Sequence, residues 1–101
     1  MLNEQNKELC KKVLEKYGVP HQLLKLGEEC TELAQVIFRI AQGETNEENM
    51  CNLIEELIDV RVMQEELTIY FQERMDSFKE MLNEGAAMKL KRALEEENEI
   101  D

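Results

Sequence analysis

The sequence predicts an all-α protein, a small antiparallel bundle of four helices, on three observations. Four Gly and one Pro among 101 residues leave little turn chemistry, and the residue types that dominate the chain favour helices. Apolar residues recur at spacings of three and four, which is the helical period. No strand pattern and no internal repeat interrupt them. At this length we expect one domain over residues 1–101.

Apolar residues at helical spacing predict a first helix over residues 2–17, which Gly18 ends. Pro20 suits the first turn of a second helix, which we expect over residues 21–42 with Gly43 as its stop. This second helix is apolar over most of its circumference. We therefore expect it to be buried on several sides, within a bundle or against another subunit.

Thr45 and Glu48 have the spacing of a capping box, with Thr45 as N-cap of a third helix that runs to about residue 71. We expect a break over residues 72–76 and a fourth helical region over about 77–97. Gly85 inside that region costs about 1 kcal/mol relative to Ala, which allows for a kink or a helix in two parts. The acidic tail from about residue 95 is expected to fray.

Composition excludes several classes of function. The chain carries 23 Asp and Glu against 12 Lys and Arg, which argues against sequence-independent binding to nucleic acid. It contains no apolar run of membrane-spanning length and no signal-peptide pattern at its N-terminus. Its three Cys are widely spaced, so they indicate neither a disulfide framework nor a zinc site. We expect a protein of the reducing cytoplasm.

Two pairs of acidic residues are the candidate functional site. Glu29 and Glu32 lie three residues apart in the second helix, and Glu56 and Asp59 in the third. Residues at this spacing are neighbours on one helix face, and like charges on core-leaning faces are costly unless a cation lies between them. Carboxylate ligands suit Mg²⁺, with Mn²⁺ as the alternative. The competing interpretation is a solvated surface, as most charged stripes are.

Further polar residues continue both stripes. Gln22 and Lys25 precede the first acidic pair at helical spacing, and Asn52 precedes the second. The four-helix di-iron proteins use Glu-x-x-His twice, and the one His of this chain lies outside such a motif. Acids on helices also differ from the loop ligands of an EF-hand. Magnesium held by carboxylates commonly serves phosphoryl chemistry.

In this chain, Glu-Glu-x-x-Glu (Glu28, Glu29, Glu32) is followed after 23 residues by Glu-x-x-Asp (Glu56, Asp59). Together the motifs resemble those of the MazG-like, all-alpha nucleoside triphosphate pyrophosphohydrolases, especially the short phage- and Firmicute-like members. The resemblance covers residues 17–94. It includes the segments around the motifs and the late basic run, Tyr17-Gly18, His21-Gln22-Leu23-Leu24-Lys25, Asn52 to Val60 and Lys89-Leu90-Lys91-Arg92.

The resemblance implies hydrolysis of a nucleoside triphosphate between its α and β phosphates, giving monophosphate and pyrophosphate. It places Mg²⁺ on Glu29, Glu32, Glu56 and Asp59. It gives Glu28 a role in orienting water. It assigns binding of phosphate, sugar or base to five residues: Gln22, Lys25, Asn52, Lys89 and Arg92. Family members form dimers or dimers of dimers, so a homo-oligomer is expected.

Two alternatives remain open. One is a related enzyme with another substrate, such as a phosphoribosyl-ATP pyrophosphohydrolase or a dUTP- or dCTP-specific member. The other is a non-catalytic helical interaction module whose acidic stripes are only a soluble surface. This chain lacks the Trp residues that stack on bases in some relatives. The resemblance therefore leaves the preferred base open, as the first alternative requires.

Overall fold

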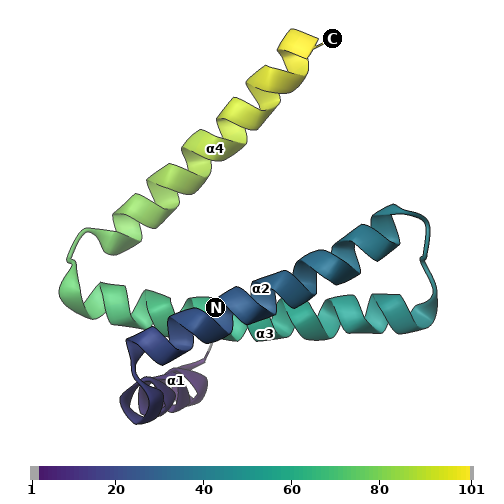
Figure 1. Ribbon diagram of the computed structural model, residues 1–101. Helices are drawn as coiled ribbons and strands as arrows, with labels where there is room; N and C mark the ends of the chain where they lie inside the picture. The colour runs from purple at the N-terminus through teal and green to yellow at the C-terminus, as the bar shows by residue number, and fades with distance from the viewer. Residues whose placement is uncertain (1–2, 101) are drawn as a thin grey trace. The chain divides into compact units, whose positions relative to one another are not determined.

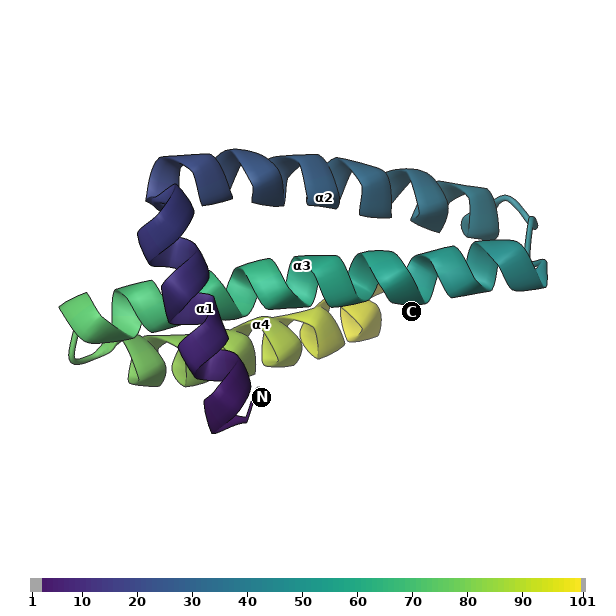
Figure 2. The ribbon, with the colours of Figure 1, turned by 90° about the horizontal axis from the view of Figure 1, so that it is seen from below.

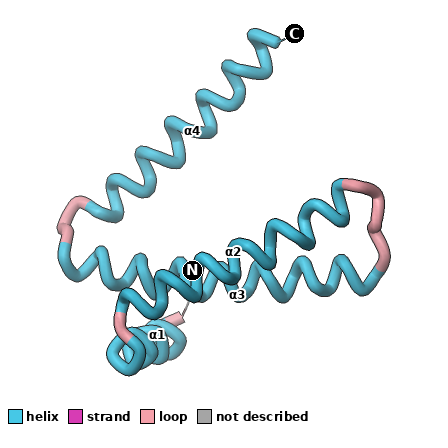
Figure 3. The backbone as a smooth tube through the Cα atoms, in the orientation of Figure 1, coloured by secondary structure: helices cyan, strands magenta, loops and turns pink. Residues whose placement is uncertain are grey.

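The computed structural model describes residues 3–100, with side chains to residue 96. Its elements are four α-helices, α1 (Glu4–Tyr17), α2 (Val19–Ala41), α3 (Glu47–Arg74) and α4 (Phe78–Ile100), joined by short loops (Figures 1 and 3). Over these residues there is no strand, which confirms the all-α prediction. Position 2, where the first helix was expected to begin, lies outside the described residues. None of the helices described is long and apolar enough to cross a membrane.

Contacts divide the chain into two compact units, and the division falls inside α3, after Ile69. The first unit contains α1, α2 and most of α3. The second contains the end of α3 and α4. The single-domain organisation expected from the chain length stays a prediction.

One residue, Gly18, separates α1 from α2. Its φ of 83° lies in the left-handed region that favours glycine, and its backbone N–H donates to the Leu14 carbonyl at 2.9 Å. Pro20 occupies the first turn of α2, where its missing N–H leaves no intrahelical hydrogen bond unmade. At the other end of α1, the Asn3 side chain accepts a hydrogen bond from the Asn6 backbone N–H at 2.8 Å. Both ends of α1 are therefore set by local sequence.

The loop between α2 and α3 corrects the predicted capping box. The N-cap is Asn46, whose Oδ1 accepts a hydrogen bond from the Asn49 backbone N–H at 2.8 Å. Thr45 lies one residue earlier, in a turn where its N–H donates to the Gly43 carbonyl at 2.9 Å. Asn is at least as good an N-cap as Thr, so the adjacent Asn takes the position. Asn49 adds a side-chain hydrogen bond to the Glu44 carbonyl at 2.8 Å and is itself buried.

The interior of the first unit is small. Its buried apolar residues are Cys10, Val36, Met63 and Ile69. Many apolar side chains of α2 and α3 remain exposed, including Leu23, Leu24, Ile37, Phe38, Met50, Ile54, Leu57 and Ile58. Within the described part of the first unit, α2 is therefore not buried on several sides. Exposed apolar surface of this extent is unusual for a monomeric protein.

In the second unit, α3 continues to Arg74 and α4 starts at Phe78, close to the predicted break. The rings of Phe71 and Phe78 lie 5.4 Å apart across this break, and the Arg74 guanidinium lies 3.7 Å from the Tyr70 ring centroid. The α4 helix passes through Gly85 without interruption, so the helix is not divided into two parts there. Glycine can adopt helical backbone angles at a modest cost in free energy.

Candidate metal centre

The helices α2 and α3 are antiparallel partners in the first unit and lie side by side (Figure 2). Their alignment is fixed by a hydrogen bond from Gln22 Nε2 to Glu66 Oε1 at 3.0 Å. Seven residues further along α2 comes Glu29, and seven residues back along α3 comes Asp59. Equal steps on antiparallel helices keep residues opposite each other. The two acidic stripes predicted from the sequence therefore face one another.

Three carboxylates converge in this region. Single ligand oxygens of Glu29, Glu32 and Glu56 all lie within 4.8 Å of one another. Glu29 and Glu56 are half-buried and Glu32 is exposed. Among the described residues, Glu29 Oε2 and Glu56 Oε2 are buried without a hydrogen-bond partner. Two buried, unsatisfied acceptors side by side require either a proton or a cation.

The pKa shifts of these carboxyl groups indicate the same need for a proton or a cation. Burial raises the pKa of Glu29, and the charges of Glu32, Asp59 and Glu56 raise it further. Burial also raises the pKa of Glu56, with Glu32 and Asp59 as the next causes. The charges of Glu32 and Asp59 thus make Glu29 and Glu56 harder to ionise. The cluster is unfavourable as a fully charged group by itself.

These residues fit a small divalent cation. The donor set is oxygen only, which Mg²⁺ and Mn²⁺ prefer. Ligand oxygens that share one Mg²⁺ lie about 3–4 Å apart, so oxygens within 4.8 Å of one another would have to move closer together to hold a single ion. Asp59 is exposed and lies outside this group of three. Its charge still acts on Glu29 and Glu56, which places it beside the cluster. Three of the four predicted ligands are therefore brought together, with the fourth adjacent.

The remaining predicted site residues fall in three places. Lys25 and Glu28 line a shallow exposed pocket of about 190 Å³ together with His21 and Leu24. Asn52 is half-buried in the first turns of α3. Lys89 and Arg92 are exposed on α4, where their spacing of three residues puts them on one helix face. They belong to the second unit, which leaves their relation to the cluster a prediction.

Gln22 is held by a chain of contacts that the sequence did not reveal. The rings of Tyr17 and His21 stack at 5.0 Å, and the His21 Nδ1–H donates to Gln22 Oε1 at 2.8 Å. This orients the Gln22 amide nitrogen toward Glu66. Gln22 is 2% exposed and Glu66 only 1%. Gln22 is thus fixed inside the unit and is not a solvent-facing side chain.

Glu66 is the main residue that the sequence reasoning missed. Burial raises its pKa, while the hydrogen bond from Gln22 and the charge of Lys25 lower it. The spacing of residues on α3 contained a signal for Glu66. Glu56, Asp59, Met63 and Glu66 follow one another at intervals of three, four and three, which continues the acidic stripe along the same face of α3.

Comparisons with known proteins add no relative. No protein-family model matches the chain, and none of the curated proteins or solved structures compared with it is similar to it.

Proposed function

We propose that this protein is a metal-dependent nucleoside triphosphate pyrophosphohydrolase that cleaves between the α and β phosphates. The observation that carries the proposal is the convergence of three carboxylates with two buried oxygens left without a partner. This feature supports a cation site. The choice of reaction is supported by the resemblance of the two acidic motifs, and by their opposed positions on antiparallel helices.

In this proposal Glu29, Glu32 and Glu56 hold Mg²⁺ or Mn²⁺, and Asp59 completes the set after a small movement. A divalent cation bound here supplies the positive charge that attracts phosphate oxygens and activates water. Glu28 immediately precedes Glu29 on α2, is exposed, and is assigned to orienting water. Without a cation the negative charge of the cluster repels a triphosphate, so substrate binding and metal binding are coupled.

Basic residues are assigned to the phosphates. Lys25 lies one helical turn before Glu29 on α2, within reach of a chain of phosphates that extends from the cluster. Lys89 and Arg92 are assigned to the same role from α4. Asn52 lies one turn before Glu56 on α3 and is assigned to the sugar or a phosphate.

Assembly belongs to the proposal as well. The exposed apolar side chains of α2 and α3 support a homo-oligomer, a dimer or a dimer of dimers, in which a second copy covers them. The cysteines of the described part are all free, which agrees with the proposed reducing cytoplasm.

The test combines metal titration with product analysis. We expect stoichiometric binding of Mg²⁺ or Mn²⁺, and equal amounts of monophosphate and pyrophosphate from a triphosphate in the presence of magnesium. A chelator should abolish turnover. Diphosphate with orthophosphate as products would refute cleavage between the α and β phosphates.

The phosphate assignment has its own variants. Lys89→Ala and Arg92→Ala should each lower kcat/KM by on the order of tenfold or more, because a charge-assisted hydrogen bond contributes about 1.5–3 kcal/mol. Metal affinity should stay unchanged. Lys91→Ala is the matched control, since it removes the same charge from a neighbouring exposed position. If the three variants behave alike, phosphate binds elsewhere.

The second candidate is a non-catalytic helical interaction module, which the exposed apolar surface favours. Metal titration separates the candidates, because a solvated acidic surface binds divalent cations weakly and without defined stoichiometry. A related pyrophosphohydrolase, such as a phosphoribosyl-ATP or a dUTP- or dCTP-specific enzyme, would retain the metal centre and differ only in substrate.

A further inference from the structure

The open end of the α2–α3 hairpin, away from its loop, is held by one buried amide. Gln22 Nε2 on α2 donates a hydrogen bond to Glu66 Oε1 on α3 at 3.0 Å, and it lies 3.9 Å from Met63 Sδ on the same helix. All three side chains are buried. Outside the carboxylate cluster, these are the side-chain hydrogen bonds that join α2 to α3 in the described part of the chain. The pair of Gln22 and Glu66 is called the clamp.

The direction in which the Gln22 amide points is set by its neighbours. Its oxygen accepts a hydrogen bond from the His21 Nδ1–H at 2.8 Å. The His21 ring in turn stacks on Tyr17, with the ring centroids 5.0 Å apart and the planes inclined by 20°. A side-chain amide has one oxygen acceptor and two N–H donors. Since the oxygen faces His21, the nitrogen faces α3, and each polar atom of the amide has a partner inside the protein.

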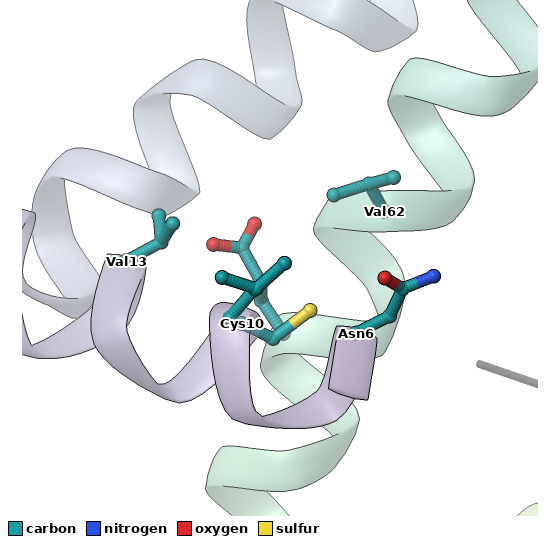
Figure 4. Close-up of a pocket in the computed structure, with 6 residues that line it drawn as sticks. Asn6, Cys10, Val13 and Val62 are labelled. Atoms are coloured by element: carbon teal, nitrogen blue, oxygen red, sulfur yellow. The ribbon is translucent and has the colours of Figure 1, made fainter. Parts of the chain in front are cut away.

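The Glu66 end of the clamp is covered by α1. A cavity of about 250 Å³ lies between α1 and α3, and it is lined by Asn6, Leu9, Cys10, Val13, Val62 and Glu66. Figure 4 shows Asn6, Cys10 and Val13 on one helix and Val62 on the facing one. The lining is mostly apolar, and at 1% exposure Glu66 has almost no access to bulk water. Because water cannot easily replace it, a hydrogen bond in such surroundings is a strong link between two helices.

The clamp and the loop hold the hairpin on either side of the carboxylate cluster. At one end, the loop joins α2 to α3 covalently. Towards the other end, Gln22 lies seven residues before Glu29 on α2. Glu66 lies ten residues after Glu56 on α3. These steps correspond to about 10–15 Å of helix.

Between these two points the carboxylates push the helices apart, because they carry like charges. Their ligand oxygens lie within 4.8 Å of one another and have to approach further to share one ion. A hairpin that is free to open at one end would separate them instead. The spacing of the cluster therefore depends on the link at the open end.

We propose that Gln22 and Glu66 are positioning residues of the metal centre, and that their hydrogen bond holds α2 and α3 close enough for the carboxylates to share one cation. The inference rests on the cation site of the proposed function and does not depend on its reaction. A preorganised site binds more tightly, because it is not ordered anew when the ion arrives. Loss of the clamp therefore weakens metal binding in a protein that is still folded. A purely structural role lowers stability alone.

The first test measures Mn²⁺ affinity by calorimetry, at a temperature well below the Tm of every variant. Gln22→Leu removes the clamp and should raise the Kd about tenfold, as expected when a hydrogen bond to a carboxylate is lost. The exchange variant Gln22→Glu/Glu66→Gln reverses which side chain donates, so its Kd should return close to the wild-type value. Asn3→Ala is the control, because it removes the N-cap of α1 and should lower the Tm without changing the Kd. The same Kd in wild type and Gln22→Leu, or no recovery in the exchange variant, would overturn the inference.

His21→Phe tests the clamp from an exposed position. The variant keeps a ring that can stack on Tyr17 and removes the donor to Gln22, so the amide loses its fixed direction. The Kd for Mn²⁺ should rise about threefold, in line with the loss of one hydrogen bond between neutral groups. This variant replaces Gln22→Leu if the latter does not fold, and an unchanged Kd then overturns the inference.

A second readout needs no metal and keeps the two proposals separable. Cys30 on α2 and Cys51 on α3 are exposed, whereas burial raises the pKa of the Cys10 thiol and makes it less reactive. Spin labels on the exposed pair report the distance between α2 and α3 by double electron–electron resonance, in labelled protein diluted with unlabelled protein. The distance distribution should be longer or broader in Gln22→Leu than in wild type, and it should recover in the exchange variant.

The two readouts together assign each failure. If wild type binds no Mn²⁺ but the distances change in Gln22→Leu and recover in the exchange variant, the proposed cation site fails and the alignment by the clamp stands. If Mn²⁺ binds and triphosphate is hydrolysed, but neither the Kd nor the distances change in Gln22→Leu, the clamp fails alone. A change in Kd with unchanged distances also overturns the inference, because the effect then does not pass through the spacing of the helices.

Discussion

Replacing Glu29 by Gln should stabilise the protein in the absence of metal. The substitution removes one charge from the cluster and keeps the size of the side chain. Glu29 has ligand oxygens of two other carboxylates within 4.8 Å, and repulsion at that distance is about 1 kcal/mol for each pair in a water-like dielectric. Salt screens part of it. We therefore expect a net gain on the order of 1 kcal/mol in the free energy of unfolding, which corresponds to a rise in Tm of about 4–8 °C.

The assay is a thermal melt of wild type, Glu29→Gln and Glu28→Gln in a chelator and in magnesium. Glu28→Gln is the matched control, because it removes the same charge from an exposed neighbour outside the group of three carboxylates. Its Tm should stay close to that of wild type, within about 0.5 kcal/mol of stability. Magnesium at a hundred times its Kd should stabilise wild type and the control by about 2.7 kcal/mol, and Glu29→Gln much less. The same melting behaviour for both variants, with and without magnesium, would refute the reasoning.

Three further predictions concern acidity, capping and assembly. The metal-free protein should lose stability as pH rises above the ordinary glutamate pKa of 4.5, because the folded state holds protons longer than the unfolded state on three carboxyls whose pKa is raised, Glu29, Glu56 and Glu66. Denaturant titrations between pH 4.5 and 7 measure this, and stability that increases over that range would contradict it. Asn46→Ala should cost about 1 kcal/mol in a denaturant melt and Thr45→Ala much less, since only the former removes the cap of α3; equal losses would restore Thr45 as the cap. Light scattering at micromolar concentration should give a mass of at least two chains, and a monomer would reject the proposed assembly.

How far the sequence predicts the site depends on how far apart along the chain the interacting residues lie. Glu29 and Glu32 share one helix face by spacing alone, and so do Glu56 and Asp59, so helical periodicity was enough to predict two stripes. That three of these carboxylates converge depends on the alignment of α2 with α3. The alignment is fixed by the hydrogen bond between Gln22 and Glu66, a contact between residues 44 positions apart that no local pattern contains.

Other features show where local signals fail. In the charged run before Leu67, the neighbours Glu65 and Glu66 look alike in the sequence. In the structure the Glu65 carboxylate lies 3.7 Å from Arg61, whereas Glu66 is buried. Thr45 has the spacing of a capping box, but the competing cap Asn46 is its immediate neighbour. Lys89 and Arg92 belong to the second unit, and helix periodicity carries no information on where that unit lies relative to the cluster.

The carboxylate cluster lies wholly on α2 and α3, whereas four of the six residues around the cavity come from α1. α1 is a separate segment at the start of the chain, joined to α2 through Gly18 alone. Substitutions on its cavity-facing side can therefore reshape the wall of the cavity without displacing any carboxylate of the cluster. The cavity wall and the carboxylate cluster are thus separate parts of the fold. Exchange of the α1 segment can therefore change the lining of the cavity while the α2–α3 hairpin, with its three carboxylates, is kept.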